Sequence, residues 1–210
     1  MGVKYFCNRN NQRDKNVNST IKKNFFFLIN SWIYKENKFN TNLKTHLLGK
    51  RSGFAIINTE HQIEMLKRTI SFLKEVSKPS IDNTHILFLN TNSHTKFDAV
   101  SKLFALRCGE IFFNNKWIGG TLTKTTQKFL YKAIIVYNPE KNIFFIKEIN
   151  KIGIPLIAFS NVTSNISTIM YPVIGNNSHI DSIFYSSLIL SNSILETKLL
   201  SYLQLTNSKR

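Results

Sequence analysis

Short apolar runs alternate with segments of helical period along most of this 210-residue chain. The runs have the length and continuity of strands that are buried on both faces of a sheet. Between them, apolar residues recur every three or four positions, as on one face of a helix. This alternation predicts an α/β domain with a five-stranded parallel sheet flanked by helices, a three-layer fold of flavodoxin-like or Rossmann-like type with right-handed crossovers. The expected strands lie at 53–58, 85–90, 110–113, 133–137 and 155–159.

Local signals place the ends of the expected helices. Thr59 and Gln62 have the spacing of a capping box, and Ser77-Lys78-Pro79 would end the helix that they open. A second helix should begin near Thr95, and the segment 172–177 should be a turn before the last helix. The apolar residues of the second helix are expected to point inward, and they are Val100, Leu103, Phe104 and Cys108.

The net charge of +16 favours a polyanion as partner. The charge is uneven, because residues 1–51 hold 11 Lys and Arg against 2 Asp and Glu. We therefore expect a basic N-terminal arm over residues 1–42, partly disordered when free, and an α/β domain over 43–210. No apolar run is long enough to span a membrane, and two cysteines are too few for a disulfide framework or a zinc site.

The stretch from Asn114 to Thr123 holds the only adjacent glycines of the chain, Gly119 and Gly120. Two glycines permit positive φ angles or close approach of a partner, and the amides around such a turn can cradle phosphate oxygens. An ordinary turn is the simpler interpretation, since neither the dinucleotide-binding nor the P-loop spacing is present. Trp117 could stack on an unpaired base or pack in the core.

Four blocks in order resemble the family of small-subunit ribosomal protein number two. The segment Trp-Ile-Gly-Gly-Thr-Leu-Thr at 117–123 is similar to the family's Trp-Leu-Gly-Gly-Thr-Leu-Thr. The segments at 48–58, 154–158 and 171–177 resemble its Arg-Asn-Gly-x-x-Ile-Ile-Asp, Ile-Pro-Val-Ile-Ala and Tyr-Pro-Ile-Pro-Gly-Asn-Asp segments. Bacterial members of the family have a long helical hairpin after the glycines. Only residues 124–132 precede the next expected strand, so this is a short form without that hairpin.

The resemblance implies a structural constituent of the small ribosomal subunit, bound to small-subunit rRNA and to other small-subunit ribosomal proteins. It implies no catalysis, no cofactor, no small-molecule substrate and no membrane. Lysines without intervening acids flank the glycine pair, and a second basic cluster precedes the first expected strand. A solvated loop is an equal interpretation of that second cluster. The expected RNA-binding residues are Lys44, Lys50, Arg51, Lys116, Trp117, Gly119, Gly120, Thr121, Thr123, Lys124, Lys128, Asn176 and Asn177.

Two other classes of function remain open. One is a nucleotide- or phosphosugar-binding α/β enzyme that uses the Gly-Gly turn, with a deep pocket at the strand ends. Several expected strands end in Asn, at the edge where such sheets bind ligands, although Asn also suits turns. The histidines and carboxylates show no catalytic or metal-ligand spacing. The other class is a free RNA-binding regulator outside the ribosome.

Residue usage suggests an origin. The chain is rich in Asn, Ile, Lys and Phe and poor in Ala, which is typical of an AT-rich genome such as that of an organelle or a parasite. Together with the resemblance, this bias predicts a ribosomal protein of the mitochondrial matrix.

Overall fold

Five parallel strands form the central sheet of the protein. The computed structural model describes residues 33–35, 46–51, 54–79, 85–90, 95–113, 118–120, 122–123, 131–137, 139–141, 143–161, 165–177 and 179–207. The strands β4 (His85–Asn90), β5 (Ile111–Phe113), β6 (Tyr131–Tyr137), β7 (Leu156–Ser160) and β8 (Tyr171–Ile174) lie in the order β5-β4-β6-β7-β8. All neighbouring strands of this sheet are parallel. This is the flavodoxin-like strand order, and the predicted fold class is confirmed.

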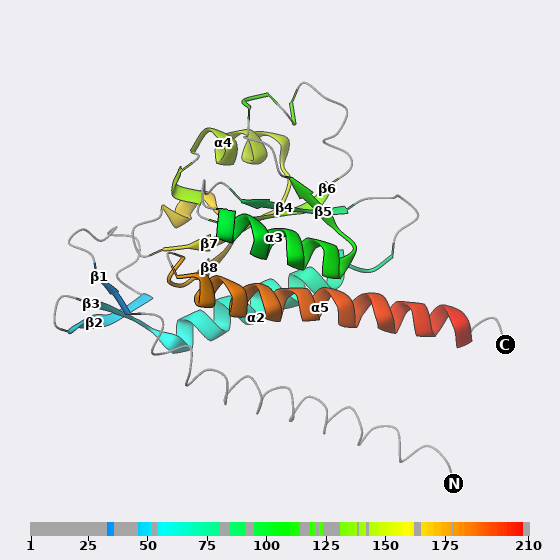
Figure 1. Cartoon of the computed structure of the whole chain (residues 1–210), viewed down its shortest axis with the longest axis horizontal. Coiled ribbons are helices and arrows are strands. Elements are labelled where there is room, and N and C mark those ends of the chain that lie inside the picture. Colours follow the sequence, from blue (N-terminus) through cyan, green and yellow to red (C-terminus); the bar gives the residue numbers. More distant parts are fainter. Residues whose placement is uncertain are drawn as a thin grey trace, which may run out of the picture.

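Helices cover both faces of the sheet. Alternate residues of each strand point to opposite faces, so that Ile86 and Phe88 of β4 belong to one apolar cluster and Leu87 and Leu89 to another. The first cluster lies against α2 (Thr59–Val76), α3 (Thr95–Cys108) and α5 (Ile180–Asn207). The second lies against α4 (Ile143–Ile152). Figure 1 shows α4 on one side of the sheet and the other three helices on the opposite side.

A separate antiparallel sheet contains the strand that was expected to open the parallel sheet. β3 (Phe54–Ile57) lies between β1 (Ile33–Lys35) and β2 (Leu47–Arg51). The prediction that this run joins the central sheet is therefore wrong. Only residues 52 and 53 connect β2 to β3, and a link of two residues forces neighbouring strands to run antiparallel. β1 lies within the predicted arm, whose other residues are outside the described part of the chain.

The fifth strand of the parallel sheet is β8, in a segment that was expected to be a turn. The strand was missed because of Pro172, since proline removes a backbone donor and is found in strands chiefly at sheet edges. β8 is indeed an edge strand. The edge is closed by α2, where the Gln62 side chain donates to the Ile174 carbonyl and Phe72 stacks on Tyr171 at 4.2 Å between ring centroids.

The helices follow the predicted ranges, with two corrections. Asn58 rather than Thr59 is the N-cap of α2, because its side-chain oxygen accepts from the Glu60 amide at 3.0 Å. Leu103 of α3 is exposed, whereas Phe104 and Cys108 are buried as predicted. Burial raises the pKa of the Cys108 thiol to about 11, as suits a core residue.

Among the described helices, none combines the length and apolar character that a membrane crossing requires.

The packing of α5 on the sheet includes one buried polar contact that can be tested. The Ser187 hydroxyl donates to the Tyr137 hydroxyl at 3.0 Å, and both side chains are buried. In Tyr137→Phe the serine loses this acceptor, so we expect the free energy of unfolding to fall by about 1 kcal/mol. Urea unfolding monitored by circular dichroism measures the change.

Tyr185→Phe is the matched control, because Tyr185 is an exposed residue of the same helix. It should change the free energy of unfolding by less than about 0.5 kcal/mol. Equal losses in the two variants would contradict a specific role for the buried pair.

Candidate nucleic-acid interface

The segment around the glycine pair is anchored in the core by a leucine. The described residues of this segment are 118–120 and 122–123, between β5 and β6. The Leu122 side chain is only 1% exposed and belongs to the apolar cluster that includes Phe145 and Ile149 of α4. Ile118, by contrast, is 73% exposed. The segment thus lies on the α4 face of the sheet, with one side chain inward and its glycine end toward solvent.

A carboxylate from α4 fixes the backbone of this segment. Oε1 of Glu148 accepts from the amides of Leu122 and Thr123 at 2.9 and 3.1 Å and from the Thr123 hydroxyl at 3.3 Å. Its Oε2 accepts from the Gly120 amide at 3.1 Å. A carboxylate is acceptor-only when ionised, so it is suited to receive several converging donors. Bonds of this kind, with one charged partner, are about twice as strong as neutral ones.

The amides expected to cradle phosphate therefore hold an anion of the same chain. The geometry is a nest of backbone N–H groups, as predicted for a Gly-Gly turn, but its occupant is Glu148. Gly120 has φ of +93°, a conformation that disfavours any residue with a β-carbon. A β-carbon added at Gly119 would meet no heavy atom within 4 Å. The glycine requirement of the turn therefore lies at Gly120.

Several of the expected RNA-binding residues cannot be compared with the structure. Lys50 and Arg51 lie in β2, where only the backbone is described. The remaining ones lie outside the described residues, and they are Lys44, Lys116, Trp117, Thr121, Lys124 and Lys128. Of those that are described, Thr123 is an exposed residue whose hydroxyl is bound to Glu148.

The two expected asparagines after β8 are inside the domain. Asn176 and Asn177 are each 3% exposed. The Asn177 side chain donates to the Phe159 carbonyl at 3.4 Å, and the Gly175 amide donates to the Ser160 carbonyl at 3.0 Å. These bonds tie the turn after β8 to β7. In this arrangement the asparagine side chains support the turn rather than forming its outer surface.

Asparagines at other strand ends also have structural partners. Asn58 caps α2, and Asn90 at the end of β4 donates to the Asp98 carboxylate at 2.6 Å. Near the ends of β7 and β8, the cavity lined by Asn176, Asn177 and Ser186 measures about 10 Å³, about enough for one water molecule. That volume is far too small for the nucleotide or phosphosugar that the enzyme alternative requires.

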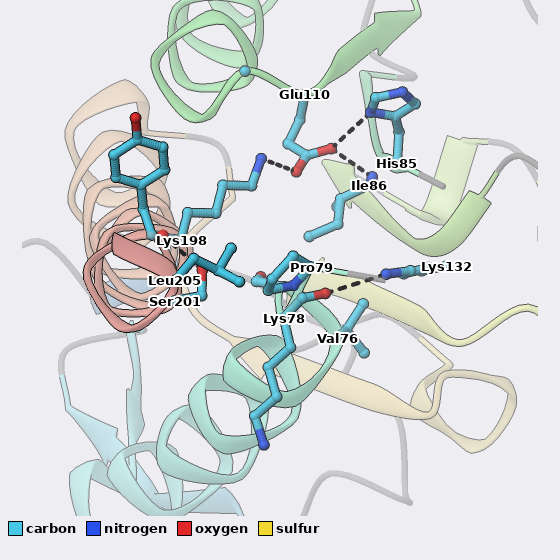
Figure 2. Close-up of a pocket in the computed structure, with 13 residues that line it drawn as sticks. Val76, Lys78, Pro79, His85, Ile86, Glu110, Lys132, Lys198, Ser201 and Leu205 are labelled. Carbon is cyan, nitrogen blue, oxygen red and sulfur yellow. Dashed lines mark hydrogen bonds and ion pairs between the residues drawn. The ribbon is translucent and has the colours of Figure 1, made fainter. Parts of the chain in front are cut away.

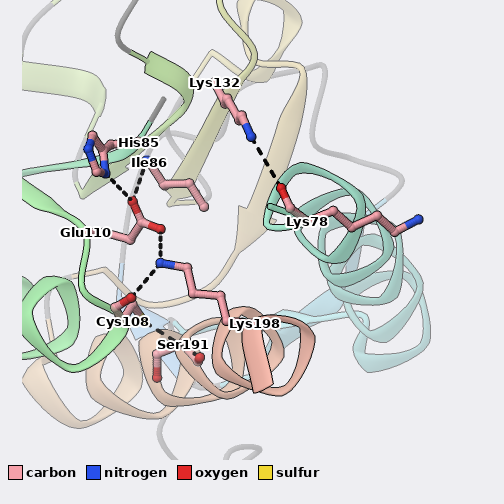
Figure 3. Close-up of polar contacts among 8 residues, drawn as sticks. All are labelled: Lys78, His85, Ile86, Cys108, Glu110, Lys132, Ser191 and Lys198. Carbon is pink, nitrogen blue, oxygen red and sulfur yellow. Dashed lines mark hydrogen bonds and ion pairs between the residues drawn. The ribbon is translucent and has the colours of Figure 1, made fainter. Parts of the chain in front are cut away.

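The amino ends of the parallel strands, at the opposite end of the sheet, carry a polar cluster that the sequence did not reveal. Glu110, whose side chain is 5% exposed, accepts from the Ile86 amide at 2.7 Å and forms an ion pair with Lys198 of α5. Lys198 also donates to the Cys108 carbonyl at 2.7 Å, and His85 Nδ1 lies 3.6 Å from the Glu110 carboxylate (Figure 3). No group of three or more potential metal ligands occurs among the described residues. The cluster joins β4, α3 and α5, and a cavity of about 330 Å³ adjoins it (Figure 2).

Replacing Glu148 tests whether it holds the family-like segment at 117–123, which we call the signature segment. Glu148→Gln has one acceptor oxygen in place of two and turns an amide donor toward backbone donors. We expect the free energy of unfolding to fall by about 1–2 kcal/mol. Hydrogen exchange at the Gly120, Leu122 and Thr123 amides should also accelerate, which mass spectrometry or NMR measures. Glu64→Gln on α2 is the control, because it removes only an exposed ion pair with Arg68. Unchanged exchange at the three amides in Glu148→Gln would contradict the anchoring.

The two glycines should respond differently to alanine. Gly120→Ala places a β-carbon at positive φ, which costs about 1 kcal/mol or more. Gly119→Ala meets open space and should stay within about 0.5 kcal/mol of the parent protein. Thermal or urea unfolding of the two single variants gives the comparison. A larger loss at Gly119 than at Gly120 would show that the turn has another geometry.

Comparison with known proteins gives one consistent family. The family model described as Ribosomal protein S2 matches residues 34–130 and 125–197. The two matched segments overlap at residues 125–130.

Similar proteins carry the corresponding name. The small ribosomal subunit protein uS2 of Ehrlichia chaffeensis is 24% identical over 210 residues, covering 78% of this chain and 71% of that protein. The protein of the same name from Dictyoglomus thermophilum is 24% identical over 204 residues, with 74% and 81% covered. The small ribosomal subunit protein uS2m of Acanthamoeba castellanii is 27% identical over 193 residues, with 87% and 58% covered. With the family model matched over most of its length, the chain belongs to the ribosomal protein S2 family.

Proposed function

We propose that this chain is a structural, non-enzymatic constituent of the small ribosomal subunit that binds small-subunit rRNA and neighbouring ribosomal proteins. The observation that carries the proposal is the family match over residues 34–130 and 125–197. The similar proteins described above are named as small-subunit proteins. The net charge of +16 supports a polyanionic partner.

The RNA-binding surface that we propose surrounds the signature segment. Lys116, Lys124 and Lys128 flank the glycine pair in sequence, and no acidic residue occurs between Glu110 and Glu140. The nearby amides are bound to Glu148, so phosphate contacts would come from these lysine side chains rather than from the backbone nest. Contacts between lysines and phosphates position a protein on RNA without reading its sequence. A fixed segment between them would lower the entropic cost of binding.

The enzyme alternative finds no support in the similar proteins or in the described geometry. It requires free amides at the Gly-Gly turn and a pocket at the carboxyl ends of the strands. Three of those amides bind Glu148, and the cavity near the carboxyl ends of β7 and β8 measures only about 10 Å³.

We further propose that the subunit is that of a mitochondrial ribosome. The Acanthamoeba relative, with the suffix m in its name, is a mitochondrial form, and the residue usage of this chain suits an organellar genome. Bacterial relatives of comparable similarity support the small subunit but not this compartment. The basic arm would add contacts to rRNA, because residues 1–51 carry an excess of 9 positive charges.

Salt dependence of RNA affinity tests the proposed surface. The triple variant Lys116→Ala, Lys124→Ala, Lys128→Ala should bind small-subunit rRNA more weakly. The slope of log affinity against log salt should also become shallower, by about one for each lysine that no longer neutralises a phosphate. Filter binding or fluorescence anisotropy between 50 and 200 mM salt, roughly the range over which such contacts change affinity most, gives the slope.

The control carries the same loss of charge elsewhere. Lys67, Lys102 and Lys151 are exposed residues of α2, α3 and α4, and their triple alanine variant should keep the slope closer to that of the parent protein. If the slope becomes equally shallow in both triple variants, binding depends on net charge and the proposed surface is wrong.

The alternative of a free RNA-binding regulator is tested by sedimentation, because a regulator would not travel with the small subunit.

A further inference from the structure

A groove at the amino ends of the parallel strands is not explained by rRNA binding. It measures about 330 Å³, near the lower end of the range for ligand sites. The end of α2, the starts of β4 and β6 and the last turns of α5 enclose it (Figure 2). We call it the α5 groove and define it by Val76, Ile86, Lys132, Lys198, Tyr202 and Leu205.

One wall of the α5 groove is apolar and exposed. Tyr202 and Leu205 are 68% and 55% exposed, and they line the groove together with Val76. The last turns of α5, where these residues lie, run out past α2 and α3 (Figure 1). Leu199 and Leu203 of the same turns are also more than half exposed. An exposed apolar patch on a protruding helix is characteristic of a protein interaction site.

The polar side of the groove has unused positive charge. Glu110 already accepts from Lys198 and from the Ile86 amide, so the carboxylate is satisfied within the domain. Among the described residues, Lys132 donates only to the Lys78 carbonyl, at a long 3.4 Å, and forms no ion pair (Figure 3). Its ammonium group has three donors and can bind a carboxylate at the groove.

Net charge disfavours two occupants that the chain itself could supply. The N-terminal quarter carries an excess of 9 positive charges, and a second copy carries +16, so both are repelled by a cationic groove. An RNA occupant fits the apolar wall poorly. Residues 199–207 contain no charged side chain and are rich in leucine, whereas RNA sites combine basic residues with aromatic platforms.

We propose that the α5 groove docks a segment of a neighbouring protein that places a bulky apolar side chain beside an acidic one. The apolar side chain packs on the exposed Tyr202 and Leu205 of α5, and the carboxylate pairs with Lys132. The proposal rests on the proposed function, because it takes the neighbour to be a component of the same ribosomal subunit. It assigns a protein contact to the side of the sheet away from the signature segment.

Photo-crosslinking in the assembled particle tests this proposal. The full chain is expressed with p-benzoyl-L-phenylalanine in place of Tyr202, and small subunits that contain it are purified by sedimentation and irradiated. Digestion and mass spectrometry then identify the adduct. The same crosslinker in place of Phe144, an exposed residue of α4, is the positional control. We expect position 202 to yield an adduct with an acidic protein segment that position 144 does not give.

A charge reversal distinguishes docking from mere proximity. Lys132→Glu should lower the yield of the adduct at position 202 by about fivefold or more, because the carboxylate of the partner is then repelled. Lys67→Glu on the exposed face of α2 makes the same charge change and should leave the yield within about twofold. Lys132 is partly exposed and lies at the start of β6, so its reversal leaves the core intact.

Three results would overturn the proposal while leaving the proposed function in place. They are an adduct with rRNA, a particle that contains the chain but gives no adduct at position 202, and a yield that Lys132→Glu does not change. A chain that fails to sediment with the small subunit would instead overturn the proposed function itself, together with this inference. The sedimentation step therefore separates the two failures.

Discussion

Burial of the parallel sheet on both faces is the constraint on which the rest of the structure depends. Parallel strands need cover on each side, since their connections place helices on the faces. On β6, Ala133, Ile135 and Tyr137 point to one cluster, and Ile134 and Val136 point to the other. Three helices cover the first face, but α4 is the only α-helix among the described elements on the second. Leu122 of the signature segment completes the cover of this second face. The segment is therefore a structural part of the domain.

The Glu148 carboxylate supplies a negative charge to the turn within a chain that is otherwise strongly basic. A turn with converging amides attracts an anion, and a carboxylate from α4 meets that demand within the domain. The segment is then held in one conformation within the domain, so the RNA contacts that we propose would cost less entropy. The glycine at +93° is needed because the backbone must turn its amide toward that carboxylate.

Much of the fold could be predicted from local pattern, and the exceptions have physical reasons. β4, β6 and β7 are continuous apolar runs, and such runs are diagnostic of strands buried on both faces. The run at Phe54–Ile57 has the same pattern, but its pairing is decided by the two-residue link to β2 rather than by its own residues. β8 was missed because its proline imitates a turn. Leu103 was expected to be buried because it lies beside the apolar stripe of α3. The sequence pattern fixes which face of a helix is buried only to within about one residue.

The site was less predictable than the fold. The glycine pair stands out by adjacency alone, and the positive φ at Gly120 agrees with the conformational freedom expected of it. Glu148 and Glu110 were not predicted, because their partners are brought to them by the tertiary fold. Glu148 binds amides more than twenty positions earlier, and Glu110 pairs with Lys198 across 88 positions. No local spacing encodes such contacts, whereas the family motif marks the segment that Glu148 holds.

The measurement that tests the central claim most directly is a cryo-electron microscopy structure of the small ribosomal subunit from the organism that encodes this chain. The account predicts that the chain is present, that the Glu148 carboxylate lies on the amides of Gly120, Leu122 and Thr123, and that rRNA phosphates lie against the lysines flanking that segment. A subunit without this chain would contradict the account. So would a segment whose amides bind phosphate while Glu148 points elsewhere.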